Sequence, residues 1–288
     1  MAFGQQITIG GAAVSANLGL AQSKSNDADA VAAGYGSRLL MRVSTRDVRR
    51  TADNPTGAKR VHPLAPNRDP LLFMGSGVSV GAISGKYGAR EVFAMTATGN
   101  VSAGTANDLK AGPKSLNGMA SGFTLFGVAH YEASMLGSGF HALVTMLRDG
   151  SQLESMLVHQ FAGGINYMTA FSDQGDSNGV NVDMATVPAL VAGAPFAYCL
   201  RIKPITTSAN VDLWINNLTT PVITSTGKPL PEAGQYELLL GHTLIDSQQW
   251  SGGHGDAYVI QGDALATLDD KALATALMLE MKAYYGIG

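Results

Sequence analysis

The sequence has little cysteine and little charge, and both shortages limit what the protein can be. It holds one cysteine in 288 residues, and charged residues make up 14% of the chain. A single cysteine cannot form an intrachain disulfide. Cys199 lies in the apolar run Phe196–Leu200, and no histidine stands beside it to activate a nucleophile. We therefore expect a buried and inert thiol.

Long apolar runs are also missing. No run reaches the roughly 20 residues that are needed to span a bilayer, so the sequence predicts no membrane segment. The first six residues, Met1 to Gln6, contain no basic residue and no continuous apolar stretch of the kind that opens a secretory signal. These features predict a soluble protein that is made in a cytoplasm.

Glycine and apolar residues are plentiful instead. The chain has 35 glycines and 45% apolar residues, with a net charge of only −3. Such a composition argues against disorder and provides material for a large core. Low charge combined with many small residues suits an all-β protein with many turns. It also suits a subunit that hides much of its surface in an assembly.

Charge is divided unevenly along the chain. Residues 1–115 hold 13 Lys and Arg against 7 Asp and Glu, whereas residues 116–288 hold 6 against 15. The first 30 residues are small and polar, and prolines interrupt the chain at positions 63, 66 and 70. We interpret residues 1–68 as an extended basic arm that lies on a neighbouring molecule, with one strand at Leu39–Val43. The arm's partner-binding residues are then Arg38, Arg42, Arg46, Arg49 and Arg50.

Residues 69–288 show the pattern of a β domain. Short segments that alternate apolar and polar residues are separated by Gly, Asn and Asp, which is typical of half-buried strands. The predicted strands are Val78–Ile83, Glu91–Thr98, Phe123–Tyr131, His141–Leu147, Glu154–Phe161, Ile165–Phe171, Phe196–Ile202, Val211–Ile215, Glu237–Leu240 and Ala257–Ile260.

One helix is expected near the end of the chain. Thr267 is a suitable N-cap with an acidic residue, Asp270, three positions later, and Gly286 is placed to end the helix in a left-handed conformation. An apolar face repeats at helical spacing between these limits. Its expected members are Leu273, Ala276, Leu277, Met281 and Tyr284.

Five segments of the C-terminal part carry recognisable motifs in a characteristic order, namely Phe196–Ile202, Val211–Asn217, Tyr236–Gly241, Gly252–Ile260 and Ala283–Gly286. Together they resemble the concanavalin A-like, laminin-G-like superfamily, including members found in bacteriophage virions. The turn at Asn216-Asn217 is similar to the family's Asn-Gly turn, since Asn tolerates positive φ. The resemblance implies an all-β fold, namely a two-sheet antiparallel jelly-roll sandwich with one C-terminal amphipathic helix.

Jelly rolls of this type include glycan-degrading enzymes, but their catalytic motifs are absent from this sequence. The Glu-x-Asp-x-x-Glu strand of retaining glucanases, which pairs two carboxylates on one face, does not occur. The Gln-Ile-His and Tyr-x-Lys-x-Gly strands of alginate-lyase-like relatives are missing too. We therefore expect no enzymatic activity.

Two binding sites are suggested, each beside an ordinary structural alternative. Oxygen ligands gather between residues 173 and 183, where they could hold Ca²⁺ or simply form a long turn. These residues are Asp173, Asp176, Asn178 and Asp183. A sugar-stacking surface could form from Trp250, His254 and Tyr258, with His254 expected to be exposed in a glycine-rich loop, or these rings could belong to the core.

The leading functional hypothesis is a non-enzymatic structural or adhesive subunit of a large assembly, most plausibly a phage virion. Its partners would be other virion proteins and further copies of itself, bound through the arm, together with cell-surface glycan. Because the arm has hardly any aromatic side chains for base stacking, a protein partner is favoured over nucleic acid. The alternatives are a free carbohydrate-binding module and a divergent glycan-degrading enzyme.

Overall fold

The fold was obtained as a computed structural model of the whole chain. It describes residues 26–47, 60–61, 72–74, 78–95, 109–111, 119–148, 152–172, 179–234, 236–242 and 248–288. Asp173, Asp176, Asn178, Arg49 and Arg50 lie outside these residues.

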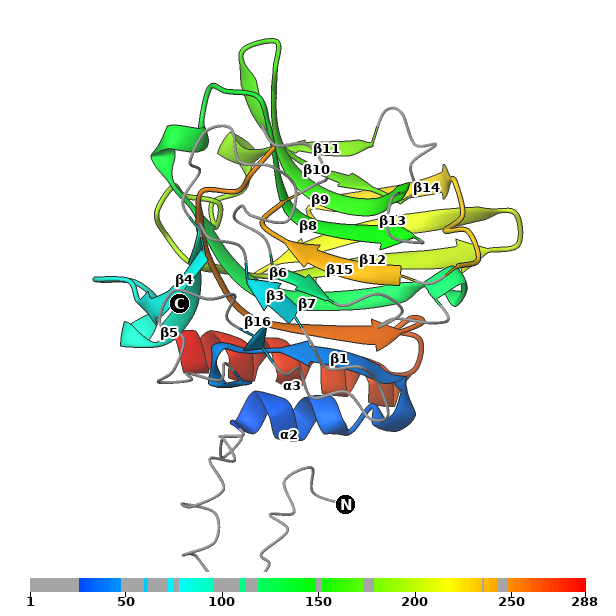
Figure 1. The fold of residues 1–288 in the computed structure, drawn as a ribbon. Coiled ribbons are helices and arrows are strands. Elements are labelled where there is room, and N and C mark those ends of the chain that lie inside the picture. Colours follow the sequence, from blue (N-terminus) through cyan, green and yellow to red (C-terminus); the bar gives the residue numbers. More distant parts are fainter. Residues whose placement is uncertain are drawn as a thin grey trace, which may run out of the picture.

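Two antiparallel sheets pack face to face as a sandwich (Figure 1). The first sheet has the order β14 (Ile223–Lys228), β13 (Ser208–Ile215), β12 (Phe196–Ile205), β7 (Phe123–Tyr131), β16 (Gly252–Gln261), β5 (Glu91–Met95) and β4 (Val78–Ala82), and β1 (Leu39–Val43) also pairs with β16. The second sheet has the order β11 (Val180–Asp183), β10 (Ile165–Phe171), β9 (Gln152–Ala162), β8 (Phe140–Arg148), β15 (Tyr236–Leu240), β6 (Leu109–Ala111), β3 (Leu72–Met74) and β2 (Arg60–Val61). The predicted jelly-roll class is confirmed.

Two helices lie on the outer face of the first sheet, α2 (Asp27–Ala33) and α3 (Leu268–Tyr285) (Figure 1). Because side chains alternate along a strand, β7 supplies both layers, with Leu125 in the core between the sheets and Phe126 in the layer beneath α3. This double cover explains why every residue of β7 is buried. Short 3-10 helices connect some of the elements, at Gly36–Arg38, Thr45–Asp47, Tyr87–Ala89, Met119–Ser121, Ala133–Met135 and Met184–Thr186.

The ends of α3 are as predicted, but its buried face is rotated. The Thr267 side chain accepts a hydrogen bond from the Asp270 backbone N–H at 3.0 Å, and Gly286 ends the helix with a φ of 62°. The apolar residues that are fully buried are Ala274, Leu277, Met278, Met281 and Tyr285. The expected face shares only two residues with this set, Leu277 and Met281. The others border it, with Leu273 and Tyr284 half-buried at the rim of the cluster.

The extended arm is wrong for residues 26–47, which fold into the sandwich. Asn26 caps α2 through a capping box with Asp29, and α2 packs beside α3. Strand β1 pairs with the second half of β16, whereas β5 pairs with its first half. The two strands therefore share one edge of β16, one after the other. The folded domain consequently includes residues 26–47 and does not begin at residue 69.

Arginines of this segment bind partners inside the domain. Arg38 Nη1 lies 2.8 Å from Asp270 Oδ1, and Arg42 Nη1 lies 2.6 Å from Asp29 Oδ2. The Arg46 Nη2 group lies 2.7 Å from Asp256 Oδ2 and 3.2 Å from Asp29 Oδ1. Three of the five residues expected to hold a neighbour thus hold the chain's own acidic residues.

Candidate functional site

The predicted sugar-stacking residues are buried, so the expected ligand surface is absent at this place. Trp250, His254 and Tyr258 each have 0% exposure. The interpretation of residues 252–256 as an open glycine-rich loop is wrong, because this segment is the first half of β16, between β7 and β5. Glycine serves here to let neighbouring groups approach, since a Cβ at Gly255 would lie 2.7 Å from the Tyr285 ring.

Each of the three rings has a polar partner in the interior. Trp250 Nε1 donates to a backbone carbonyl at 2.9 Å, and the Tyr258 hydroxyl donates to Asp29 Oδ1 at 2.8 Å. His254 Nε2 lies 2.7 Å from the Tyr198 hydroxyl. Burial lowers the pKa of His254 to about 4, so this imidazole is neutral at pH 7. The polar atom of each ring therefore has a hydrogen-bond partner in the interior, which is what a core residue requires.

Cys199 is buried as expected, and burial raises the pKa of its thiol.

The calcium prediction falls mostly outside the described residues. Of its four residues only Asp183 is described, and this carboxylate caps a 3-10 helix by accepting a hydrogen bond from the Ala185 N–H at 2.9 Å. Within the described residues, no group of three His, Cys, Asp or Glu side chains could hold a metal ion. Calcium binding by the loop at 173–178 stays a prediction.

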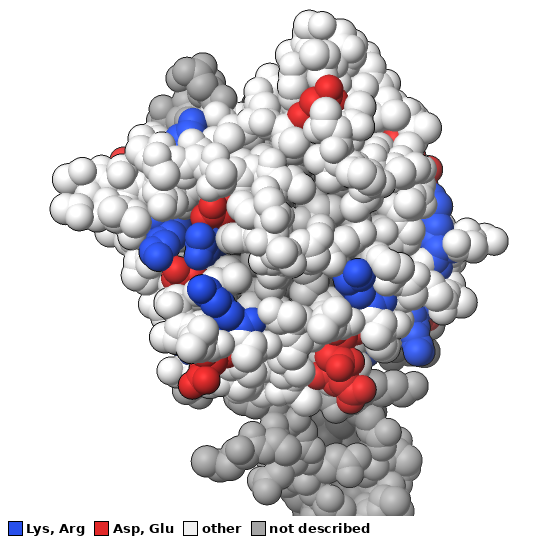
Figure 2. All heavy atoms as spheres, turned by 180° about the vertical axis from the view of Figure 1, so that it is seen from behind, with Lys and Arg blue, Asp and Glu red and all other residues white. Residues whose placement is uncertain are grey.

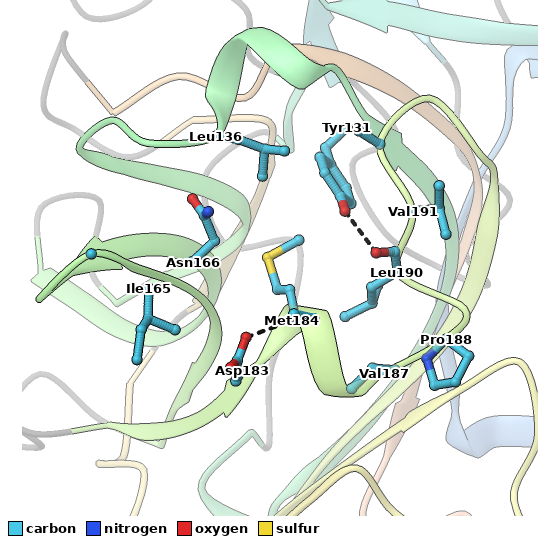
Figure 3. Close-up of a pocket in the computed structure, with 13 residues that line it drawn as sticks. Tyr131, Leu136, Ile165, Asn166, Asp183, Met184, Val187, Pro188, Leu190 and Val191 are labelled. Carbon is cyan, nitrogen blue, oxygen red and sulfur yellow. Dashed lines mark hydrogen bonds between the residues drawn. The ribbon is translucent and has the colours of Figure 1, made fainter.

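A hollow of about 520 Å³ opens where β10, β11 and the segment after β11 meet the end of β7 (Figure 3). We call it the edge pocket. Its volume is within the range of small-molecule sites. The residues that line it are Tyr131, Leu136, Gly164, Ile165, Asn166, Asp183, Met184, Ala185, Val187, Pro188, Leu190, Val191 and Ala192.

Exposed apolar side chains surround the edge pocket. Leu136 is 37% exposed, Ile165 is 38% exposed and Val191 is 55% exposed. These are three of the six large apolar residues that are exposed in the described part of the chain. The floor is apolar too, with Met184 pointing toward the middle of the hollow in Figure 3. Apolar groups gathered around a hollow indicate a binding site more strongly than single exposed ones.

The wall of the edge pocket is held in place by hydrogen bonds from β7. The Tyr131 hydroxyl donates to the Leu190 carbonyl at 2.8 Å (Figure 3). The Gly193 N–H donates to the Tyr131 carbonyl at 2.7 Å. On the opposite side, Asp183 is fixed by its capping bond to Ala185. The segment 183–193 is therefore attached to the sandwich at both ends, through the pairing of Asp183 with β10 at one end and through Tyr131 at the other.

Asn166 is the second polar side chain of the edge pocket, and its orientation is determined. Its Oδ1 accepts from the Gly137 backbone N–H at 2.9 Å and also contacts His159 Nε2 at 3.0 Å. Since a backbone N–H can only donate, the atom facing it is the amide oxygen, and His159 Nε2 must carry the proton in the second bond. The amide NH₂ group is then left for other partners.

His159 is itself held firmly. Its ring stacks on His141 with 5.6 Å between centroids, and His141 Nδ1 lies 2.7 Å from the Gln249 carbonyl oxygen. Burial lowers the pKa of His159, so its imidazole is neutral at pH 7. Neither histidine lines the pocket, but His159 holds the Asn166 side chain by a hydrogen bond and His141 stacks on His159.

A second, smaller hollow of about 380 Å³ lies next to the end of α3. Its lining combines both signs of charge, with Arg46 and Arg90 both stacked on the Tyr284 ring and with Glu91 also in the lining. Figure 2 shows the same mixture on the face seen from behind, where Lys and Arg of the described residues are interspersed with Asp and Glu on a largely uncharged surface. The described residues of that face form no continuous basic patch of the kind that nucleic acid requires.

No family model and no curated protein matches this chain. Among solved structures it is similar to domain 4 of an extracellular GH43 arabinanase from Geobacillus stearothermophilus in complex with arabinotriose, at 13% identity. That match has a TM-score of 0.51 over 78% of this chain and 93% of that domain. This likeness shows the fold alone, and it agrees with the jelly-roll class.

Two other matches have TM-scores below 0.5. A heptameric SAP-like pentraxin from Limulus polyphemus has 10% identity and a TM-score of 0.39, over 55% of this chain and 70% of that one. The receptor-binding domain of botulinum neurotoxin type G has 10% identity and a TM-score of 0.46, over 87% of this chain and 51% of that one.

None of the helices in the described residues is long and apolar enough to cross a membrane.

Proposed function

We propose that this chain is a non-enzymatic, lectin-like module that binds glycan in the edge pocket. The observation that carries the proposal is a hollow in which an amide donor and a carboxylate acceptor stand among exposed apolar side chains. Sugars match such a surface, because their hydroxyls both donate and accept while their C–H faces are apolar. The arabinanase domain of similar fold, solved with arabinotriose, supports the proposal by analogy of fold.

The absence of enzymatic activity is part of the proposal. Glycoside hydrolysis generally needs two carboxyl groups on either side of the scissile bond, about 5 to 9.5 Å apart. Asp183 is the only carboxylate among the described residues that line the edge pocket. A single carboxylate can accept hydrogen bonds from a sugar but cannot serve as both acid and base. Recognition without turnover is therefore the expected behaviour.

Replacing Asp183 with Ala tests the site. Loss of a charged hydrogen-bond acceptor costs about 1.5–3 kcal/mol, so we expect glycan affinity to fall roughly tenfold to a hundredfold. The glycan would first be found on an array probed with the intact protein, and its affinity would then be measured by calorimetry. Asp269→Ala is the control, because Asp269 is an exposed carboxylate on α3, outside the pocket.

The outcomes separate the site from the function. An array on which the intact protein retains no glycan contradicts glycan binding. Retention of a glycan with equal affinity by Asp183→Ala contradicts the edge pocket as its site while leaving the function in place.

We further propose that the module belongs to a larger assembly such as a phage particle, where it would bind other virion proteins and copies of itself. The support is compositional, namely the low charge of the chain and the basic residues at its N-terminal side. Arg49 and Arg50 are the candidates left for such contacts, since Arg38, Arg42 and Arg46 bind acidic residues of the chain itself.

Sedimentation of the intact chain tests this assembly role. We expect oligomers that dissociate when Arg49 and Arg50 are both changed to Ala, because both cations would contact acidic groups of a neighbour. The Arg90→Ala variant is the control, since Arg90 is an exposed arginine that stacks on Tyr284 of its own chain. An intact chain that sediments as a monomer at all concentrations would speak against self-association.

A further inference from the structure

We infer that the edge pocket selects N-acetylated sugars, and that it does so by binding the acetamido group. This inference rests on the proposed glycan-binding function and names the class of sugar. An acetamido group presents three features together: an N–H donor, a carbonyl acceptor and a methyl group. The edge pocket offers a complementary feature for each of them.

The carbonyl of the acetamido group requires a donor, and Asn166 supplies it. Both hydrogen bonds to Asn166 Oδ1, from Gly137 N–H and from His159 Nε2, point its oxygen away from the pocket. In Figure 3 the Asn166 side chain lies at the edge of the hollow. The amide cannot turn over without placing its NH₂ against the Gly137 N–H, donor to donor. The Asn166 side chain consequently presents its N–H groups, and not its oxygen, to a ligand in the pocket.

The N–H of the acetamido group requires an acceptor, and Asp183 supplies it. Its Oδ1 is occupied by the Ala185 N–H, and no hydrogen bond within the described part of the chain reaches Oδ2. An ionised carboxylate can only accept. Both polar groups line the same hollow, Asn166 from the start of β10 and Asp183 from the end of β11. One fixed donor and one fixed acceptor on adjacent strands fit an amide, which has one of each.

The methyl of the acetamido group requires an apolar surface, which the rest of the pocket provides. Leu136, Val187 and Val191 line the hollow, and the thioether of Met184 lies at its floor. Methionine adapts its shape to small apolar groups. A plain hexose would place a hydroxyl against these side chains, where the described lining leaves it few partners. Selection of the acetamido sugar follows from both polar and apolar contacts.

His159 acts here as a positioning residue. It does not line the pocket, but its Nε2–H helps to hold the oxygen of Asn166 in place. The sequence pattern had suggested no function for the half-buried His141 or for the buried His159. The structure assigns them the task of keeping the orientation of one amide.

The first experiment compares sugars on the intact protein. N-acetylglucosamine and N-acetylgalactosamine would be titrated beside glucose, galactose and glucosamine, with calorimetry or NMR shifts as the readout. We expect the acetamido sugars to bind at least about tenfold more tightly, the effect of one well-made hydrogen bond plus a buried methyl. Equal affinity for the plain hexoses overturns the acetamido inference but leaves glycan binding intact. No binding of any glycan, on the array or in titration, overturns the proposed function itself.

The second experiment changes the donor without changing its support. Asn166→Asp is nearly isosteric, and its carboxylate still accepts from Gly137 N–H and from His159 Nε2–H. The variant loses only the N–H groups that face the pocket, so we expect affinity for N-acetylglucosamine to fall about tenfold or more while thermal stability is retained. Asn181→Asp is the matched control, because Asn181 is exposed on β11 and does not line the pocket.

A second variant keeps the test decisive if Asn166→Asp does not fold. Asp183→Asn can still accept the Ala185 N–H through its oxygen, but it presents an NH₂ group where the carboxylate presented Oδ2. Weaker binding of N-acetylglucosamine with unchanged binding of glucose is expected. Unchanged affinity for the acetamido sugar in either variant, once that variant is shown to be folded, overturns the inference.

Discussion

Removing residues 1–47 is expected to unfold the sandwich, and the chain that lacks only residues 1–25 is the control. The longer deletion takes away α2 and β1, which lie between the N-cap Asn26 and Val43. Strand β1 alone buries Leu39, Leu40, Met41 and Val43. At roughly 1.5–3 kcal/mol for each large apolar side chain, these four contribute about 6–12 kcal/mol. That amount is as large as the whole stability of a typical domain, about 5–15 kcal/mol.

Loss of β1 has two further effects that apolar burial does not include. The second half of β16 would lose its hydrogen-bonded neighbour along one edge. Asp256, whose side chain is 1% exposed, would lose Arg46 and become an unpaired buried charge. Circular dichroism and thermal melts of the two truncated chains would show the result. A cooperative transition in the chain that starts at residue 48, at the temperature of the intact protein, would contradict this account.

The extended-arm interpretation predicts instead that the sandwich stays folded after this deletion. The strand at Leu39–Val43 was predicted with its observed bounds, as were β7 and β10. Its partner was not predicted, because β1 pairs with a strand more than 200 residues later. Local patterns show which residues form a strand but not which strand they meet. The arginines were therefore interpreted as free for a neighbour when their partners were Asp29, Asp256 and Asp270.

Strand β16 shows a second limit of sequence patterns. Its first half contains three glycines among five residues, a composition that favours a loop, yet it is a central strand. Tertiary packing selects glycine there, since side chains at these positions would meet His130 and Tyr285. Because this segment is a central strand, His254 and Tyr258 on it and Trp250 just before it are all buried. They therefore cannot form the expected sugar-stacking surface.

The edge pocket is assembled from residues that no local pattern connects. Tyr131, Asn166 and Asp183 come from three strands, and only Asp183 was singled out, as a calcium ligand. One signal in the sequence could have indicated the region. The segment Val187–Val191 is apolar although it follows a strand end and contains a proline, and apolar residues in a connection require an explanation.

Arg46→Met is expected to destabilise the sandwich strongly. Arg46 binds Asp256 and Asp29 at once, and its side chain is only 9% exposed. Methionine fills a similar volume but leaves the Asp256 carboxylate buried without its cation. Breaking a buried pair from one side costs roughly 3–5 kcal/mol, which corresponds to a decrease in Tm on the order of 10 °C for a protein of this size.

Arg90→Met is the matched control for this prediction. Both arginines stack on the Tyr284 ring, at 5.2 Å for Arg46 and 4.5 Å for Arg90, but Arg90 is exposed and has no carboxylate partner among the described ion pairs. The control removes a cation–π contact worth about 0.5–1 kcal/mol at an exposed site. Calorimetric melts of both variants would separate the two contributions. Equal melting temperatures for Arg46→Met and Arg90→Met would show that Tyr284 stacking, and not the buried carboxylates, gives Arg46 its effect. A Tm for Arg46→Met that lies on the order of 10 °C below that of Arg90→Met would show that the buried ion pairs of Arg46 help to hold residues 26–47 against the sandwich.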